Sequence, residues 1–200
     1  MSGRHNEKRF KLKQDRYYIE RVLRGDVNAF SYLIDEYKGL VYTIALRMLK
    51  NAEDAEELAQ DTFVKAFKSL KDFKFESKFS TWLYRITYNA AISKLRKKQI
   101  EVYDVDDVTL PENEVVSTYS AIGELKKAEQ RRYINEAIHN LKEDDALIIT
   151  LYYLQENSIE EISEITGLNL SNVKVKLHRA RKRFYDELKV ILKDEVKAIL

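Results

Sequence analysis

The chain contains no cysteine, one proline and five glycines among its 200 residues. Without cysteine it can form neither a disulfide nor a thiolate metal site, and this agrees with a reducing compartment. The scarcity of proline and glycine leaves little to interrupt helices. Its three histidines, His5, His139 and His178, are far apart and lack the spacing of metal ligands. The sequence therefore predicts no metal and no cofactor.

Long apolar runs are also missing, since none approaches the roughly 18 residues that a membrane-spanning helix needs. The basic N-terminal segment, residues 1–16, has no apolar stretch after it and so does not resemble a secretory signal. No glycine-rich loop could hold phosphate groups. We expect a cytoplasmic protein without membrane insertion and without catalytic activity.

Helical periodicity is the main positive feature of the first half. Apolar residues recur at three- and four-residue spacing from Phe30 to Met48 and again from Ala55 to Leu70, the pattern of a helix with one buried face. Asn51 can cap the second of these helices. Ser80 can cap a third, which ends near residue 98. Together the three helices predict a compact first domain over residues 18–98.

The segment from Glu101 to Glu114 differs from its surroundings. It contains six acidic residues, no basic residue and the only proline, and neither a helical nor a strand period persists through it. Such a composition is typical of an exposed linker. We expect residues 99–123 to join the first domain flexibly to a second one, over residues 124–195.

The second domain is predicted to be helical too. Leu147, Leu151 and Leu154 form an apolar stripe. Ser158 and Glu161 have the spacing of a capping box that would begin a short helix. Gly167 lies where a glycine would end that helix. The sequence therefore favours an all-α fold with two small helical domains.

A helix-turn-helix is indicated where this short helix is followed by another. Ser171 can cap the second helix, and Leu170 and Val175 have the spacing of a hydrophobic staple. Between Leu170 and Tyr185 there are six Lys or Arg residues and no acid. Cations for phosphates and polar groups for base edges are what a recognition helix needs. The alternative is an amphipathic helix whose solvated face is basic.

Two further patterns lie in the first domain. Aromatic residues from Phe73 to Tyr88 are interleaved with cations, which continue from Arg85 to Lys98, and this combination suits single-stranded DNA. The alternative is that most of these rings belong to the core. Five acids lie between Glu53 and Asp61; the first two can complement a helix dipole, whereas Asp61 points to a protein partner.

Together these segments resemble the extracytoplasmic-function sigma factors, the smallest members of the bacterial sigma-seventy family. The resemblance covers about residues 21–192 and rests on four blocks. AFSYLIDEYKGLVYTIALRML is similar to region two-point-one and DAEELAQDTFVKAFKSL to region two-point-two, whose D-x-x-Q-[DE]-x-F pattern is here ELAQDTF. FSTWLYRITYNAAISKLRK is similar to regions two-point-three and two-point-four, and SIEEISEITGLNLSNVKVKLHRARKRF to region four-point-two.

The resemblance implies that the protein directs core RNA polymerase to promoter DNA and melts it, and it leaves open whether an anti-sigma factor binds. Polymerase contacts are implied for Glu57, Gln60, Asp61 and Phe63. Contacts to the minus-ten strand are implied for Phe75, Glu76, Ser77, Lys78, Arg85, Asn89 and Arg96. Contacts to the minus-thirty-five duplex are implied for Ser171, Asn172, Lys174, Lys176, Arg179 and Arg181. One departure is Ser93, where the family commonly has Asp.

Two alternatives compete with the sigma factor. A helix-turn-helix repressor would account for residues 158–183 but would leave the acidic helix and the aromatic loop without a role, and it would usually bind a palindrome as a dimer. A structural helical scaffold would leave the basic helix unexplained. Promoter-specific transcription with core polymerase separates the three.

Overall fold

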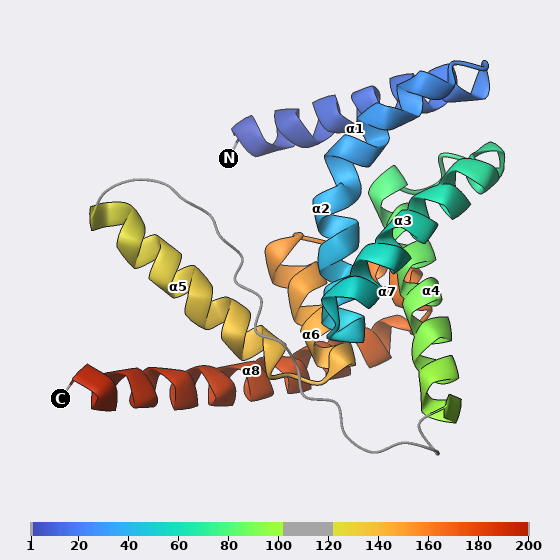
Figure 1. The fold of residues 1–200 in the computed structure, drawn as a ribbon. Helices are drawn as coiled ribbons and strands as arrows, with labels where there is room; N and C mark the ends of the chain where they lie inside the picture. The colour runs from blue at the N-terminus through green and yellow to red at the C-terminus, as the bar shows by residue number, and fades with distance from the viewer. Residues whose placement is uncertain (1, 102–121, 200) are drawn as a thin grey trace. The chain divides into compact units, whose positions relative to one another are not determined.

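The structure, a computed structural model, describes residues 2–101 and 122–199, with side chains over 10–98 and 129–192. Every regular element in these ranges is helical (Figure 1). The predicted all-α fold is therefore confirmed. Most of the acidic linker predicted for residues 99–123 lies outside the described residues.

The described residues divide into two compact units. The first contains α1 (Ser2–Leu23), α2 (Phe30–Leu49), α3 (Ala52–Ser69) and α4 (Phe79–Glu101), with the short 3-10 turns η1 (Val27–Ala29) and η2 (Leu70–Asp72). The second contains α5 (Ile122–His139), α6 (Glu143–Ile149), the π-helical turn η4 (Thr150–Leu154) and α8 (Leu170–Ile199); α7 (Ile159–Thr166) immediately precedes α8.

The helices α2 and α3 form as the apolar spacing predicts. The buried face of α2 runs from Phe30 to Met48, and α3 packs against it with its own buried stripe from Ala55 to Ala66. Asn51 caps α3: its side-chain oxygen accepts a hydrogen bond from the backbone N–H of Asp54 at 2.9 Å. This pair of helices supplies most of the buried apolar residues of the first unit.

The helix α1 was not predicted, because its apolar residues are too few to give a clear stripe. It is held to α2 by a buried polar contact: the Tyr37 hydroxyl donates to Asp15 Oδ2 at 2.6 Å. Ile19, one turn further along α1, is fully buried. Burial raises the pKa of Tyr37, so its hydroxyl stays protonated and able to donate.

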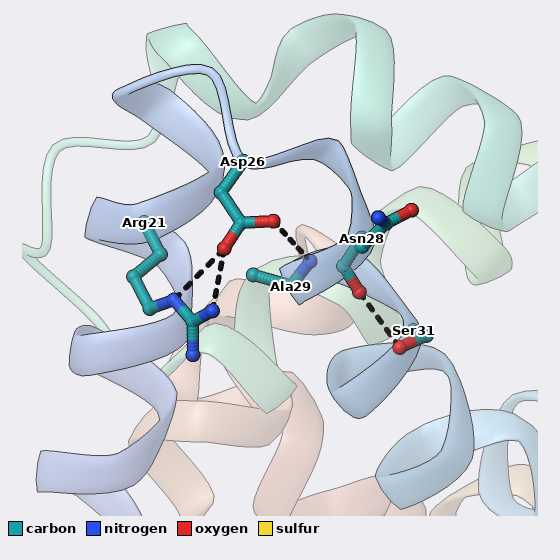
Figure 2. A network of polar contacts seen from close by, with 5 residues as sticks. All are labelled: Arg21, Asp26, Asn28, Ala29 and Ser31. Carbon is teal, nitrogen blue, oxygen red and sulfur yellow. Dashed lines mark hydrogen bonds and ion pairs between the residues drawn. The ribbon is translucent and has the colours of Figure 1, made fainter.

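A tight polar turn fixes the end of α1 against the start of α2 (Figure 2). The Arg21 guanidinium donates from Nε and Nη2 to Asp26 Oδ2 at 3.0 and 2.5 Å, while Asp26 Oδ1 accepts from the Ala29 N–H at 3.3 Å. Gly25, at φ +101°, provides a backbone conformation that side chains disfavour. The angle at which α1 leaves α2 is thus set by specific contacts.

Asp15→Asn is expected to remove part of the pH dependence of stability. Burial raises the pKa of Asp15 above its ordinary 3.8, against the opposing effects of the Tyr37 hydrogen bond and Lys11; Glu36 raises it further. In the window between the unfolded and the folded pKa the native state binds more protons, so the free energy of unfolding falls as pH rises through it.

An asparagine at position 15 still accepts from Tyr37 and has no charge to desolvate. Urea unfolding at several values between about pH 4 and pH 7 should therefore show a flatter profile for Asp15→Asn than for the wild type. The exposed Asp35→Asn is the matched control and should keep the wild-type slope. Parallel profiles for wild type and Asp15→Asn would contradict the prediction.

The start of α4 differs from the prediction. Ser80 was expected to be its cap, but the helix already includes Phe79, and the Trp82 N–H donates to the carbonyl of Lys78 at 3.1 Å. The reason is packing, since Phe79 is buried with its ring centroid 5.5 Å from that of Tyr37 and 5.8 Å from that of Phe73. Burying this ring draws its residue into the first turn.

In the second unit, α5 and α6 both pack against α8. Leu147 and Leu151 are buried as predicted, but Leu154 is exposed by 45%. The intervening turn η4 is π-helical and so contains an extra residue, which rotates Leu154 off the buried stripe. The spacing between Leu151 and Leu154 would place both on one buried stripe only in a continuous α-helix.

The helix-turn-helix forms with one change in its caps. Ser158 and Glu161 exchange the two hydrogen bonds of a capping box, at 2.9 and 3.2 Å, and Gly167 ends α7 with φ +71°. Asn169, not Ser171, caps α8, because its side-chain oxygen accepts from the Asn172 N–H at 2.8 Å. Both side chains can cap, and the turn brings Asn169 to the position directly before the helix.

Candidate polymerase and nucleic-acid interfaces

The acidic face of α3 is open to solvent. Glu57, Gln60 and Asp61 are all exposed, and they lie on neighbouring turns of one side of the helix. Phe63, the fourth residue carried over from the family, is only 8% exposed. Its side chain lies in the core beneath this face and supports the helix without reaching outward.

Lys94 connects α4 to the acidic face of α3. Its Nζ lies 2.8 Å from Asp54 Oδ1 and also pairs with Glu57. Although partial burial lowers the pKa of Lys94, its hydrogen bonds to Asp54 and Glu57 leave that pKa raised. Lys94 is thus turned away from the exposed basic residues of α4 and toward α3.

The aromatic segment between η2 and α4 is a loop with an unusual backbone. Phe75 has φ +58°, a left-handed conformation that costs a non-glycine residue about 1–2 kcal/mol. Its ring centroid lies 4.9 Å from that of Phe73, which is buried and in turn 5.2 Å from Trp82. Most of these rings therefore belong to the core, as the alternative held, but Phe75 is 37% exposed at the tip with Glu76.

The exposed polar residues of α4 share one face. Arg85, Asn89 and Arg96 are spaced by four and seven residues, which places them along a single stripe, and all three are exposed. Ser93 donates to the Asn89 carbonyl at 2.9 Å. The exposed loop tip and this basic stripe thus lie on consecutive elements of the first unit, the loop and the helix α4 that follows it.

The exposed face of α8 carries most of the residues expected to meet duplex DNA. Ser171, Asn172, Lys174 and Arg179 are exposed, whereas Val173, Leu177 and Ala180 are buried on the opposite side. Val175, expected in a staple, is 48% exposed, as is Leu170 at 45%, so neither forms one. Neither Val175 nor His178 was among the implied DNA contacts, although both are exposed on this face; the buried positions of α8 show this.

Three basic residues of α8 have partners within the second unit. Lys176 pairs with Asp144, and Arg183 pairs with Asp145, whose carboxylate is buried. The Arg181 guanidinium lies 5.6 Å from the ring centroids of both Tyr152 and Tyr153. These contacts hold α8 against α6 and η4, while Lys174, His178 and Arg179 are exposed. In residues 2–101 and 122–199 no helix is long and apolar enough to cross a membrane.

Comparison with known proteins gives a consistent result. The family model described as Sigma-70 region 2 matches residues 33–100, and the model described as Sigma-70, region 4 matches residues 131–184. The ECF RNA polymerase sigma factor SigW of Bacillus subtilis is 34% identical over 187 residues, which cover 86% of this chain and 95% of the relative. The ECF RNA polymerase sigma-E factor of Haemophilus influenzae is 32% identical, over 89% of this chain and 97% of the relative.

A solved structure agrees with these relatives. The sigma factor RpoE of Bartonella quintana, crystallised with the anti-sigma factor NepR, is 26% identical and superposes with a TM-score of 0.67 over 80% of this chain and 97% of that one. The helical order, the two matched regions and the near-complete coverage all point the same way. This chain therefore belongs to the ECF RNA polymerase sigma factors of the sigma-70 family.

Proposed function

We propose that three surfaces of this sigma factor divide the work of initiation. The exposed acidic face of α3, Glu57, Gln60 and Asp61, binds core polymerase, while Phe63 keeps that face in shape from below. The observation that carries this assignment is the separation of charge. Residues 53–61 contain five acids and no base, whereas residues 170–185 contain six bases and no acid. A phosphate backbone repels the first surface and attracts the second.

The loop and the face of α4 hold the melted minus-ten strand in this proposal. Phe75 supplies an exposed ring for stacking, and Glu76, Ser77 and Lys78 supply polar groups for an extruded base. Arg85, Asn89 and Arg96 continue the surface along α4 and can pair with phosphates. Ser93 stands where the family commonly has a carboxylate, and its hydroxyl donates to the Asn89 carbonyl.

The duplex at minus thirty-five meets the N-terminal half of α8. Ser171, Asn172, Lys174 and Arg179 reach base edges or phosphates, and Val175 offers an apolar surface for a thymine methyl group. Lys176 and Arg181 contact phosphates from the flanks, where Asp144 and the tyrosine pair of η4 orient them. The C-terminal half of α8 supports the N-terminal half that contacts the DNA.

The decisive test is transcription with purified components. The protein is added to core polymerase and a promoter library, and run-off transcripts are sequenced. A sigma factor yields transcripts that start at a defined distance from a shared two-part sequence. A protein that leaves core polymerase inactive and binds palindromic duplex DNA as a dimer would be a repressor instead.

Two lysines on α8 distinguish base recognition from phosphate binding. Lys174 and Lys182 are both exposed and lie eight residues apart on the helix. Lys174→Gln is expected to change which minus-thirty-five sequence is preferred, by about 1–3 kcal/mol at one base pair. Lys182→Gln should weaken all promoters alike and lower the salt slope of binding by about 0.9. Equal, sequence-independent losses for both variants, measured with holoenzyme, would remove the base-reading role.

Three finer assignments complete the proposal. The protein acts by binding and has no catalytic group of its own, and it works in the cytoplasm with the polymerase. An anti-sigma factor holds it inactive, as the complex of the Bartonella quintana relative suggests. Gel filtration of the tagged protein from its native cells should then show a stoichiometric second chain that core polymerase displaces.

A further inference from the structure

The helix α1 contributes a cation to the loop that we assign to the melted strand. The Arg16 guanidinium carbon lies 5.1 Å from the centroid of the Phe75 ring. Both groups are accessible, since the Arg16 side chain is 64% exposed and Phe75 is 37% exposed. A cation and an aromatic ring, both open to solvent, therefore lie side by side at the tip of this loop.

The position of Arg16 is fixed by its neighbours on α1. Asp15, the preceding residue, is hydrogen-bonded to Tyr37 inside the unit. Glu20, one turn on, accepts from Arg16 Nε at 2.9 Å. The turn of Figure 2 then holds the end of the helix against α2. These contacts present the remaining guanidinium nitrogens toward solvent beside Phe75.

The charge of α1 suits a nucleic-acid surface. Residues 2–23 include seven Lys or Arg against three acids, Glu7, Asp15 and Glu20. Asp15 is buried and Glu20 is paired with Arg16 and Arg24, so neither adds a free negative charge beside the loop. A planar cation beside an exposed ring can pair with a phosphate while the ring stacks on the attached base.

We propose that Arg16 and Phe75 together bind one nucleotide of the melted promoter strand, with Arg16 on its phosphate and Phe75 on its base. The site extends the strand-binding surface from the loop onto α1, and the inference rests on the proposed role of that loop. The left-handed backbone of Phe75 serves this site by turning its ring toward Arg16 and solvent.

Arg24 provides a matched control on the same helix-end segment. Arg24 is exposed and pairs with Glu20 at 3.8 Å. Arg16 precedes Glu20 by four residues and Arg24 follows it by four, so both arginines pair with the same carboxylate. Arg16→Gln and Arg24→Gln thus remove the same charge and the same kind of ion pair. Among the cations described for residues 10–98, only Arg16 contacts the Phe75 ring.

The measurement uses holoenzyme and a fluorescent single strand. The strand is the non-template sequence of a promoter found in the transcription test, and anisotropy is recorded across a salt series. Arg16→Gln is expected to weaken binding about tenfold and to lower the salt slope by about 0.7, the value for one phosphate on a single strand. Arg24→Gln should stay within about twofold of wild type. Arg16→Lys should keep the slope but lose part of the affinity, because it lacks the planar group.

Arg16→Gln and Arg24→Gln with equal affinities and equal slopes would overturn the inference. A third variant, alanine at Glu76, Ser77 and Lys78 together, separates this from a failure of the proposed function. If the loop variant weakens strand binding while Arg16→Gln matches Arg24→Gln, only the site on α1 is wrong. If the loop variant leaves strand binding unchanged, the assignment of the loop itself is wrong.

Discussion

Asp61→Arg is expected to abolish binding to core polymerase while the helical fold survives. Asp61 is exposed on α3, so the change should alter the free energy of unfolding by no more than about 0.5 kcal/mol. At the proposed interface, however, the variant places an arginine opposite the basic polymerase surface that the acidic face of α3 is expected to contact. Like-charge contacts cost several kcal/mol, and about 3 kcal/mol corresponds to a loss of about a hundredfold in affinity.

The control for this variant is a charge reversal elsewhere on the same helix. Glu56→Arg changes an exposed acid by the same amount but lies well around α3 from Asp61. Fluorescence titration against core polymerase should give near wild-type affinity for Glu56→Arg, and circular dichroism should be the same for all three proteins. Wild-type affinity in Asp61→Arg would refute the polymerase assignment.

Replacing Glu76, Ser77 and Lys78 together by alanine should leave holoenzyme assembly intact and block open-complex formation. Extruding a base from the duplex costs a few kcal/mol, which a polar pocket must offset. Losing about 3 kcal/mol of that compensation would lower the open population about a hundredfold. Phe75 remains in this variant, so its ring and the aromatic packing behind it are retained.

Permanganate footprinting reports the open complex, and gel filtration with core polymerase reports assembly. Alanine at Lys71 and Asp72 is the control, since both are exposed in η2 immediately before the loop. That double variant should melt promoters as the wild type does. A wild-type footprint from the triple variant would exclude the loop from strand capture.

Local patterns were sufficient for much of the fold. The buried faces of α2 and α3, the Asn51 cap, the Ser158–Glu161 capping box and the glycine after α7 all depend on residues within one or two turns of each other. Interactions of this range are visible in a linear pattern. The membership of the family was accessible for the same reason, because its motifs are continuous segments.

Other features depend on residues that are distant in the sequence. The contact between Asp15 and Tyr37 spans 22 residues and the one between Lys94 and Glu57 spans 37, so neither leaves a local pattern. The first made α1 part of the unit, and the second turned Lys94 away from the basic stripe of α4. In the same way, pairing with Asp144 and Asp145 decided the orientation of Lys176 and Arg183.

The sequence by itself determined that this protein is helical, where its acids and bases separate, and to which family it belongs. Only the tertiary structure decided which of those charged and aromatic side chains remain accessible. Phe63 and Phe75 illustrate the difference, since the resemblance implied a contact for both aromatic residues, yet one is buried in α3 and the other lies exposed beside Arg16. Accessibility depends on what packs over a residue: Phe63 belongs to the stripe of α3 that is buried against α2, whereas Phe75 lies in a loop with only Phe73 and Arg16 described beside its ring.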